Sequence, residues 1–442
     1  MKIYFCKYRL NTCWLTLILF FFTLSAFAQL PAPALIGYWQ NWQDANSPYI
    51  QLDQVDNRYN IIDVAFAVPG FGTDYRMEFI PDQVTLNTLH TQVQNLQSMG
   101  KKVLISAGGA TAPISLNNAM ERDSFCNSML RIINTYGFDG MDIDFEGSSL
   151  SVSGGSISAP VDASIINLVA SIRQMMTSFY AVHGKKMILT MAPETAFVQG
   201  GMSAYGGIWG AYLPVIDALR DSIDVLHVQL YNSGSMYGAD GGIYNEGTAD
   251  FIVAMSEAVI HGFNTAGGMF NGLPASKVAI GLPACTSAAG GGYVAPQQVK
   301  LAMDYLLGTG TQPGTYSLFN SAGYPDFRGM MTWSVNWDAV SSCGAAYSYA
   351  ANYDSIFNST TAIPGIGSKN NFLVAPLPVQ AEINLTSKSF QEKSSVKLFS
   401  STGELLESRL MSGNLLRMDC ASLSAGIYVL QIGGECVRFI KE

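Results

Sequence analysis

Three carboxylates alternate along one short and otherwise apolar segment of the sequence. The segment reads Phe138-Asp139-Gly140-Met141-Asp142-Ile143-Asp144-Phe145-Glu146. Because the side chains of an extended strand alternate between its two faces, Asp142, Asp144 and Glu146 point the same way. Like charges this close cannot all ionise at neutral pH, so at least one pKa should rise. A proton kept on Glu146 would make it a general acid, and a proton shared by Asp142 and Asp144 would let Asp144 donate a hydrogen bond.

Two other interpretations of these carboxylates fit the sequence less well. Asp-x-Asp-x-Asp spacing can supply oxygen ligands to calcium. Asp139, however, has the opposite strand parity from Asp142, and the downstream residues lack the EF-hand pattern. A solvated acidic face conflicts with the apolar residues at alternate positions. The sequence therefore favours acid–base chemistry without a metal or cofactor, and it favours a structural role for Asp139.

Eight short apolar runs predict the elements that position these carboxylates. They are Leu35–Trp39, Ile61–Val68, Val103–Ala107, Gly140–Phe145, Met187–Met191, Val225–Leu230, Val278–Leu282 and Met330–Ser334. Amphipathic segments separate several of the runs, which makes this an α/β pattern. Alternation alone also fits an open doubly wound sheet, but a count of eight favours a (β/α)8 TIM barrel. Glu146 would then lie at the carboxyl end of the fourth strand, where barrel active sites are found.

The amino-terminal segment predicts a secretory signal peptide over residues 1–28. It has basic residues such as Lys2 and Arg9, an apolar run over Leu15–Leu24, and a small-x-small cleavage site that ends at Ala28. An uncleaved anchor would need about 20 apolar residues, more than this run offers. No later segment is apolar for long enough to span a membrane, so we expect an exported chain with no membrane span after cleavage.

We expect the barrel over residues 29–358. The amino-acid composition changes twice after residue 358. Residues 359–378 are rich in Pro, Gly, Ser and Asn, which predicts a linker. Residues 379–442 contain short apolar runs joined by turn residues, which predicts a small all-β sandwich. The chain has 24 Lys+Arg against 33 Asp+Glu and a net charge of -9, so it lacks a basic footprint and is not expected to bind nucleic acid. We expect a monomer.

The sequence does not determine which cysteines form disulfide bonds. Of the 7 cysteines, those before residue 29 would leave with the signal peptide, and the odd number that remains implies a free thiol or an intermolecular bond. Cys420 and Cys436 lie in one short segment and could bridge, although spacing alone does not fix their geometry. For Cys126, Cys285 and Cys343 we expect buried, unpaired side chains.

The carboxylate segment resembles the signature of the family-18 glycoside hydrolases, the chitinase family. The signature, Asp-Gly-x-Asp-x-Asp-x-Glu, is met in full from Asp139 to Glu146. Four further stretches resemble the family, its bacterial branch in particular, and fall at predicted carboxyl ends of strands. They are Ser106-Ala107-Gly108-Gly109, Met191-Ala192-Pro193-Glu194, Gln229-Leu230-Tyr231-Asn232 and Met331-Thr332-Trp333-Ser334-Val335-Asn336-Trp337-Asp338. The resemblance covers residues 34–357.

The resemblance implies a substrate-assisted mechanism, an exception to the usual pair of catalytic carboxylates. Glu146 would protonate the leaving glycosidic oxygen, while the substrate's own 2-acetamido oxygen attacks the anomeric carbon and forms an oxazolinium ion. Asp144 would bind the acetamido N–H, and Asp142 would hold or release the shared proton. Tyr231 would orient the acetamido oxygen. Glu146 would then act as a base toward water, which implies retention at the anomeric carbon.

Nine further residues are candidates for substrate binding, each with a plain structural alternative. Trp333 could form the floor beneath a sugar, whose C–H face stacks on aromatic rings, or could simply be buried. The glycines could allow a close backbone approach or only a tight turn. The remaining polar, apolar and aromatic candidates could bind sugar or only pack internally. The full set is Trp333, Gln229, Asn232, Met191, Glu194, Phe66, Tyr38, Gly108 and Gly109.

The carboxyl-terminal segment resembles a Por-type (type IX) secretion sorting domain. The stretch Leu423-Ser424-Ala425-Gly426-Ile427-Tyr428 carries this resemblance best. It implies a secreted or cell-surface protein that engages the outer-membrane secretion machinery. A carbohydrate-binding module is the alternative, but the segment has no Trp.

Three activities stay open at this stage. The first is a secreted chitinase that hydrolyses β-1,4 links in chitin or N-acetylglucosamine oligosaccharides. The second is an endo-β-N-acetylglucosaminidase that acts on N-glycans with the same catalytic residues. The third is a non-catalytic chitin-binding barrel lectin. Such lectins commonly lack the acid, whereas Glu146 is present.

Overall fold

The computed structural model describes most of the chain as two compact units. The described residues are 30–72, 74–341, 344–358, 372–375, 379–387, 394–400, 403–432 and 435–441. The units are Met1–Phe357 and Asn358–Glu442. The expected signal peptide, residues 1–28, and Cys343 lie outside the described residues.

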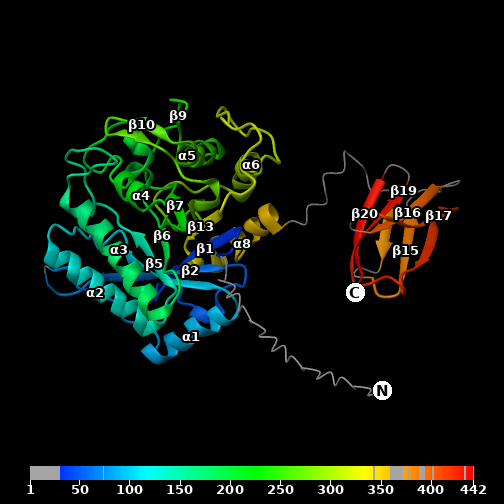
Figure 1. Ribbon diagram of the computed structural model, residues 1–442, viewed down its shortest axis with the longest axis horizontal. Coiled ribbons are helices and arrows are strands. Elements are labelled where there is room, and N and C mark those ends of the chain that lie inside the picture. The colour runs from blue at the N-terminus through cyan, green and yellow to red at the C-terminus, as the bar shows by residue number, and fades with distance from the viewer. Residues whose placement is uncertain are drawn as a thin grey trace, which may run out of the picture. The chain divides into compact units, whose positions relative to one another are not determined.

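Eight parallel strands of the first unit close into a barrel (Figure 1). In spatial order they are β1 (Ala34–Gln40), β13 (Gly329–Trp333), β12 (Val278–Pro283), β7 (Val225–Gln229), β6 (Ile188–Met191), β5 (Gly140–Asp144), β4 (Lys102–Gly108) and β2 (Ile61–Pro69). The pairing of β1 with β2, for example Ile36 with Ile61, joins the two ends of this order. The predicted TIM barrel is therefore confirmed and the open sheet is excluded.

Helices surround the barrel (Figure 1). They are α1 (Leu86–Ser98), α2 (Ala119–Tyr136), α3 (Ala163–His183), α4 (Leu213–Leu219), α5 (Ala249–His261), α6 (Pro296–Leu306), α7 (Val335–Ala339) and α8 (Ser348–Tyr353). Several of these helices have an N-cap side chain that accepts a main-chain hydrogen bond. The Asn118 side chain accepts the Glu121 N–H at α2, and the Thr248 side chain accepts the Phe251 N–H at α5. In the described part of the chain, the helices fall short of the length and apolarity that crossing a membrane requires.

Three short antiparallel strand pairs lie outside the barrel's parallel pairing in the described part of the first unit. The strand β3 (Met77–Glu78) pairs with the end of β2. The other two are hairpins formed by β8 (Met236–Tyr237) with β9 (Ile243–Tyr244) and by β10 (Phe263–Thr265) with β11 (Gly268–Phe270).

Strand parity divides the barrel residues between two buried layers. On β5, Met141 and Ile143 join the large core beneath the helices. Their neighbours Asp142 and Asp144 face the other way, into the barrel interior. The interior also holds a small apolar cluster, formed by Ala34, Ile36, Tyr38, Ile61, Ala65, Leu104, Ala192, Val225, Ala279 and Met331. The fold therefore encloses the inner carboxylates of the row in a buried interior that contains both polar and apolar side chains.

The second unit is a small all-β domain with its own core. One sheet contains β14 (Phe372–Ala375), β15 (Glu382–Ser387) and β18 (Leu415–Asp419); the other contains β17 (Leu405–Met411), β16 (Ser394–Ser400), β19 (Gly426–Ile432) and β20 (Glu435–Lys441). The strand β14 lies within residues 359–378, which we expected to be linker. Its four-residue run pairs with β15, and the surrounding Pro, Gly and Ser residues obscured it in the sequence.

One expectation about the cysteines is wrong, and one possibility left open by the sequence is excluded. Cys285 is disulfide-bonded rather than unpaired. Cys420 is buried and free, which excludes the bridge to Cys436. Cys126 is buried and free, as expected, and burial raises the pKa of its thiol to about 11.

Candidate active site

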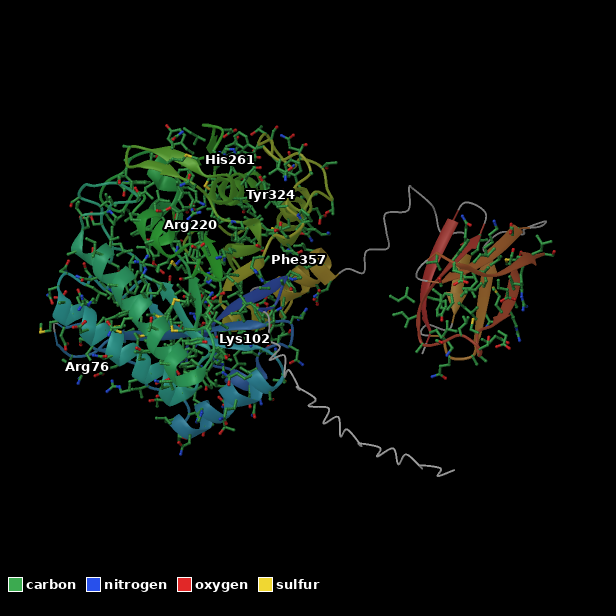
Figure 2. All side chains as sticks on the ribbon, in the orientation of Figure 1. Arg76, Lys102, Arg220, His261, Tyr324 and Phe357 are labelled. Atoms are coloured by element: carbon green, nitrogen blue, oxygen red, sulfur yellow. The ribbon has the colours of Figure 1, made fainter. Side chains whose placement is uncertain are left out.

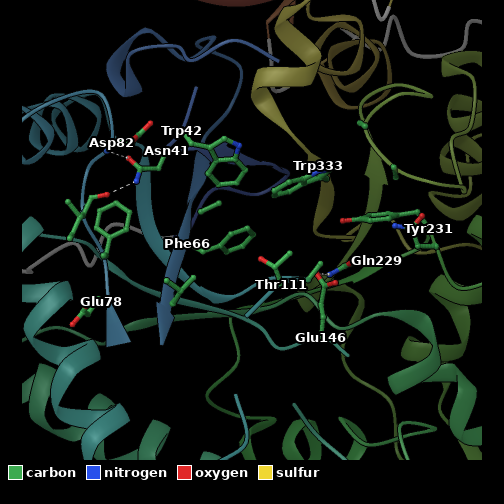
Figure 3. Close-up of a pocket in the computed structure, with 18 residues that line it drawn as sticks. Asn41, Trp42, Phe66, Glu78, Asp82, Thr111, Glu146, Gln229, Tyr231 and Trp333 are labelled. Carbon is green, nitrogen blue, oxygen red and sulfur yellow. Dashed lines mark hydrogen bonds between the residues drawn. The ribbon is translucent and has the colours of Figure 1, made fainter. Parts of the chain in front are cut away.

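The carboxylates of β5 run from the barrel interior to an open cleft. Asp142 and Asp144 are fully buried, at 0% and 3% exposure, on the interior face of the strand. Glu146 follows the end of β5, is partly exposed, and lines the cleft (Figure 3). The predicted row is therefore present, with Asp142 deepest and Glu146 at the opening.

Asp142 is surrounded by hydroxyl donors from three other strands. Its Oδ2 accepts hydrogen bonds from Tyr38 Oη at 2.6 Å and Ser106 Oγ at 2.7 Å, and its Oδ1 accepts one from Thr190 Oγ1 at 2.7 Å. Burial alone would raise the pKa of Asp142, but His227 and these hydroxyls outweigh it, so the pKa lies below its usual value. Asp142 is therefore held as a carboxylate.

Asp144 and Glu146 share a hydrogen bond and a common donor. Gln229 Nε2 donates to Asp144 Oδ1 at 2.8 Å and to Glu146 Oε1 at 3.1 Å. Burial, followed by the charges of Glu146 and Asp142, raises the pKa of Asp144 well above its usual value. Burial also raises the pKa of Glu146. A proton is thus retained in this pair at pH values where an exposed carboxyl has lost it, which a general acid requires.

The cleft above Glu146 is lined by aromatic side chains. Its volume is about 670 Å³, and its walls include Trp42, Phe66, Tyr231 and Trp333 (Figure 3). The rings of Phe66 and Trp333 are stacked, with centroids 5.7 Å apart and planes at 14°. Trp333 remains partly exposed, whereas Tyr38 is buried beneath this group. The cleft therefore offers flat apolar surfaces of the kind that bind sugar faces.

The end of β7 and the loop after β12 form the opposite wall. Tyr231 lines the cleft, and burial with the charges of Asp144 and Glu146 raises the pKa of its phenol well above the usual value, so it remains a hydroxyl donor. Asn232, next along the chain, accepts the Gly291 N–H at 3.0 Å through Oδ1. The same loop contributes Ala288 and Ala289 to the cleft.

Two glycines at the end of β4 allow a close approach to β5 and Phe66. A Cβ atom on Gly108 would lie 2.3 Å from the main-chain oxygen of Asp144, and Gly108 has a φ of +113°. A Cβ on Gly109 would lie 2.9 Å from the Phe66 ring, and the Gly109 N–H donates to the Asp144 oxygen at 2.8 Å. Close packing accounts for both glycines, and a sugar contact at either one stays a prediction.

Other candidates lie away from the cleft lining. Met191 is fully buried in the core outside the barrel, because its neighbour Thr190 faces inward. Its placement gives no support to a sugar contact. Glu194 is partly buried, and burial and the charge of Glu146 raise its pKa. Asp139 accepts from Gln97 at 3.0 Å and pairs with Lys185 at 3.0 Å, consistent with a structural role.

Several residues around the row were not among our candidates. Thr190 and Ser106 bind Asp142 directly, and Asp63 and His227 lie beside it in the interior. Their inward strand parity was the available signal. Trp42, on the segment after β1, is a different case: the sequence made it a weaker aromatic candidate with packing at least as probable, and it lines the cleft.

Sequence comparison finds chitinases among the curated relatives. The chain is 47% identical over 313 residues to Chitinase Chi52 of Paenibacillus xylanexedens, an alignment that covers 69% of this chain and 58% of the relative. It is 37% identical over 376 residues to Chitinase ChiA of Flavobacterium johnsoniae, covering 79% of this chain and 23% of the relative. The chain thus spans only part of the length of these relatives.

Structure comparison agrees. A family GH18 chitinase from Chromobacterium violaceum superposes with a TM-score of 0.65 at 37% identity, covering 74% of this chain and 84% of that structure.

Two family models match the chain in separate parts. Residues 373–441 match a secretion system C-terminal sorting domain, and the protein is accordingly secreted or held at the cell surface. Residues 34–359, which contain the barrel and the carboxylate row, match the glycosyl hydrolases family 18. With that match and relatives of this identity, the chain belongs to the glycosyl hydrolases family 18.

Proposed function

We propose that the protein is a secreted chitinase that cleaves β-1,4 links between N-acetylglucosamine units. The observation that carries this proposal is the hydrogen-bonded pair of Asp144 and Glu146 at the opening of an aromatic cleft. The relatives named chitinases support the substrate class. The sorting domain supports engagement of the outer-membrane secretion machinery.

In the proposed reaction, Glu146 protonates the glycosidic oxygen of the leaving sugar. The C2 acetamido oxygen of the substrate attacks the anomeric carbon as the glycosidic bond breaks, which forms an oxazolinium ion. Asp144 accepts the acetamido N–H and offsets the positive charge on the ring. Tyr231 donates its hydroxyl hydrogen to the acetamido oxygen. Water then opens the ring with Glu146 as base, and retention follows from the two displacements.

The row explains how Asp144 can take both roles. Before the reaction, Asp144 holds a proton and shares a hydrogen bond with Glu146, because burial and two neighbouring charges disfavour its ionised form. The ionised Asp142, with three hydroxyl donors, is an acceptor at its inner side. As positive charge develops on the substrate, Asp144 passes its proton to the Asp142 carboxylate and becomes ionised.

The test is hydrolysis of chitin and N-acetyl-chito-oligosaccharides by the wild type and by Glu146→Gln. We expect cleavage with the β-anomer as first product, and a fall in kcat of about a thousandfold in the variant, because the amide cannot donate the proton. Glu121→Gln, at a partly exposed glutamate on α2 that is not part of the cleft lining, is the matched control.

Other outcomes would replace the proposal. Binding of chitin without cleavage by the wild type would support a lectin. Release of glycans from N-glycoproteins, without cleavage of chitin oligomers, would keep the family but reassign the substrate. An α-anomer as first product would contradict the substrate-assisted route.

A further inference from the structure

A histidine lies between two carboxylates in the interior of the barrel. His227 Nε2 is 3.6 Å from Asp63 Oδ2 and 3.4 Å from Asp142 Oδ1, and all three side chains are 0% exposed. Both ring nitrogens of His227 and both carboxyl oxygens of Asp63 are buried without a hydrogen-bond partner. Because buried polar groups are almost always paired, this set, named here the interior cluster, needs an explanation.

The groups that face the interior cluster come from several strands. Tyr38 on β1 meets the His227 ring edge to face at 6.1 Å, and Asp144 follows Asp142 on β5. Ser106 on β4 and Thr190 on β6 contribute only hydroxyls, both bound to Asp142. The strands β12 and β13 contribute apolar side chains such as Ala279 and Met331. Among the described residues, His227 is thus the side chain within ion-pair distance of Asp142 that can carry a positive charge.

Charge balance then limits the protonation states of the interior cluster. A fully buried carboxylate costs several kcal/mol unless a charge or several donors compensate it. Burial and the neighbouring charge of Asp142 raise the pKa of Asp63 well above its usual value, which keeps Asp63 a neutral acid. Asp142, with three donors, takes the negative charge. A proton on His227 makes the cluster neutral overall.

A metal ion is the other occupant with suitable charge. Ligand atoms of Asp63, Asp142 and His227 lie within 4.8 Å of one another. Asp142, however, already accepts three hydroxyl hydrogens, and a proton on His227 Nε2 accounts for the close approach of that nitrogen to both carboxylates. We therefore do not assign these residues as metal ligands.

We propose that His227 is a positioning residue for the reaction: as an imidazolium it holds Asp142 in its ionised form, so that the proton of the row resides on Asp144, next to Glu146. His227 touches no substrate and acts only through Asp142. The inference rests on the proposed function for its consequence in catalysis, but the charge state of His227 is measurable without any substrate.

The first test is the pH profile of kcat/KM for N-acetyl-chito-oligosaccharide hydrolysis in His227→Asn. Asparagine is polar but cannot carry the charge, so Asp142 should take up a proton at a higher pH. We expect the acid limb of the profile to move up by about one pH unit. At the pH optimum, kcat should fall less than tenfold. An unchanged limb, or an equal fall in activity at every pH, would overturn the proposal, since either result indicates a packing role.

The matched control is His261→Asn. His261 ends α5, is exposed, and stacks on Phe319 with centroids 4.1 Å apart, outside the barrel interior (Figure 2). This variant should keep the wild-type profile. A shift as large as that of His227→Asn would overturn the proposal, because it would show that the limb responds to the loss of any histidine.

The second test uses the wild-type protein and does not depend on the variant folding. Nitrogen-15 NMR of the four histidines should show both ring nitrogens of His227 protonated at the pH of optimal activity. Asp142→Asn should remove one of those protons. A bare ring nitrogen in the wild type, or a stoichiometric divalent metal in the purified protein, would overturn the proposal. An enzyme inactive on chitin would refute the proposed function and leave this measurement intact.

Discussion

Asp142 and Glu146 lie four residues apart along one segment, but they have different surroundings. Asp142 belongs to the interior cluster, where three hydroxyls and a histidine compensate its charge. Glu146 opens onto the cleft, where burial raises its pKa and where it accepts a hydrogen bond from Gln229 and shares one with Asp144. The same type of group therefore has a lowered pKa at one end of the row and a raised pKa at the other. The number of donors around each carboxylate makes the difference.

The comparison predicts its largest effect at Asp144, which lies between Asp142 and Glu146. Asp144→Asn removes the group that takes up charge while it keeps the shape, so kcat should fall by about a hundredfold or more. The thermal unfolding midpoint should change little. Asp139→Asn, on the same segment but facing outward, should instead lower the midpoint and keep kcat. If both variants lost activity equally, the two faces of the strand would not differ as described.

The next largest effect concerns the cleft end alone. Trp333→Ala should weaken binding of an N-acetylglucosamine oligomer about tenfold, because a stacked aromatic surface is lost. Calorimetry in a Glu146→Gln background measures this without turnover. Trp209→Ala is the control, since Trp209 is 38% exposed and is not part of the cleft lining. Equal affinities in the two variants would remove Trp333 from the binding surface.

The smallest expected effect is a gain in stability. It concerns Asp63, which lies beside Asp142 at the inner end of the row. The pKa of Asp63 in the folded protein lies above its unfolded value, so the stability it contributes is complete at acid pH and is lost as pH rises toward the folded pKa. Asp63→Asn avoids that loss, so at pH 7 its free energy of unfolding should exceed that of the wild type by about 1–3 kcal/mol. The difference should shrink below about pH 4. Urea unfolding at both pH values measures it. Destabilisation at pH 7 would mean that Asp63 is ionised and paired with His227.

Strand parity was enough to predict much of this site. It placed Asp142, Asp144 and Glu146 on one face and Asp139 on the other, and the count of apolar runs predicted the barrel. Parity also turns Thr190 inward and its neighbour Met191 outward. Met191, which a family stretch made a candidate for substrate contact, stays a prediction that its buried position does not support.

Contacts across the closed barrel could not be predicted in the same way. Asp63 is on β2 and His227 on β7, and the sheet order separates these strands by β4, β5 and β6. Their side chains meet only because the barrel is narrow. Residues on loops, such as Trp42 and Ala288, depend on main-chain paths that no periodic pattern encodes. The elements were therefore predictable from local signals, whereas the interior cluster and the cleft walls required the closed structure.

The hydrogen bond from Gly291 to Asn232 couples two parts of the cleft that the sequence keeps far apart. Tyr231, which precedes Asn232, faces the reacting acetamido group in the proposed reaction, while the loop of Gly291 supplies a wall of the cleft. A redesign that grafts a different loop after β12 would leave the Asn232 oxygen unpaired and loosen the backbone that holds Tyr231. A change to the cleft wall would therefore also disturb the position of Tyr231. An engineer who wishes to alter either one must exchange the loop after β12 together with the end of β7.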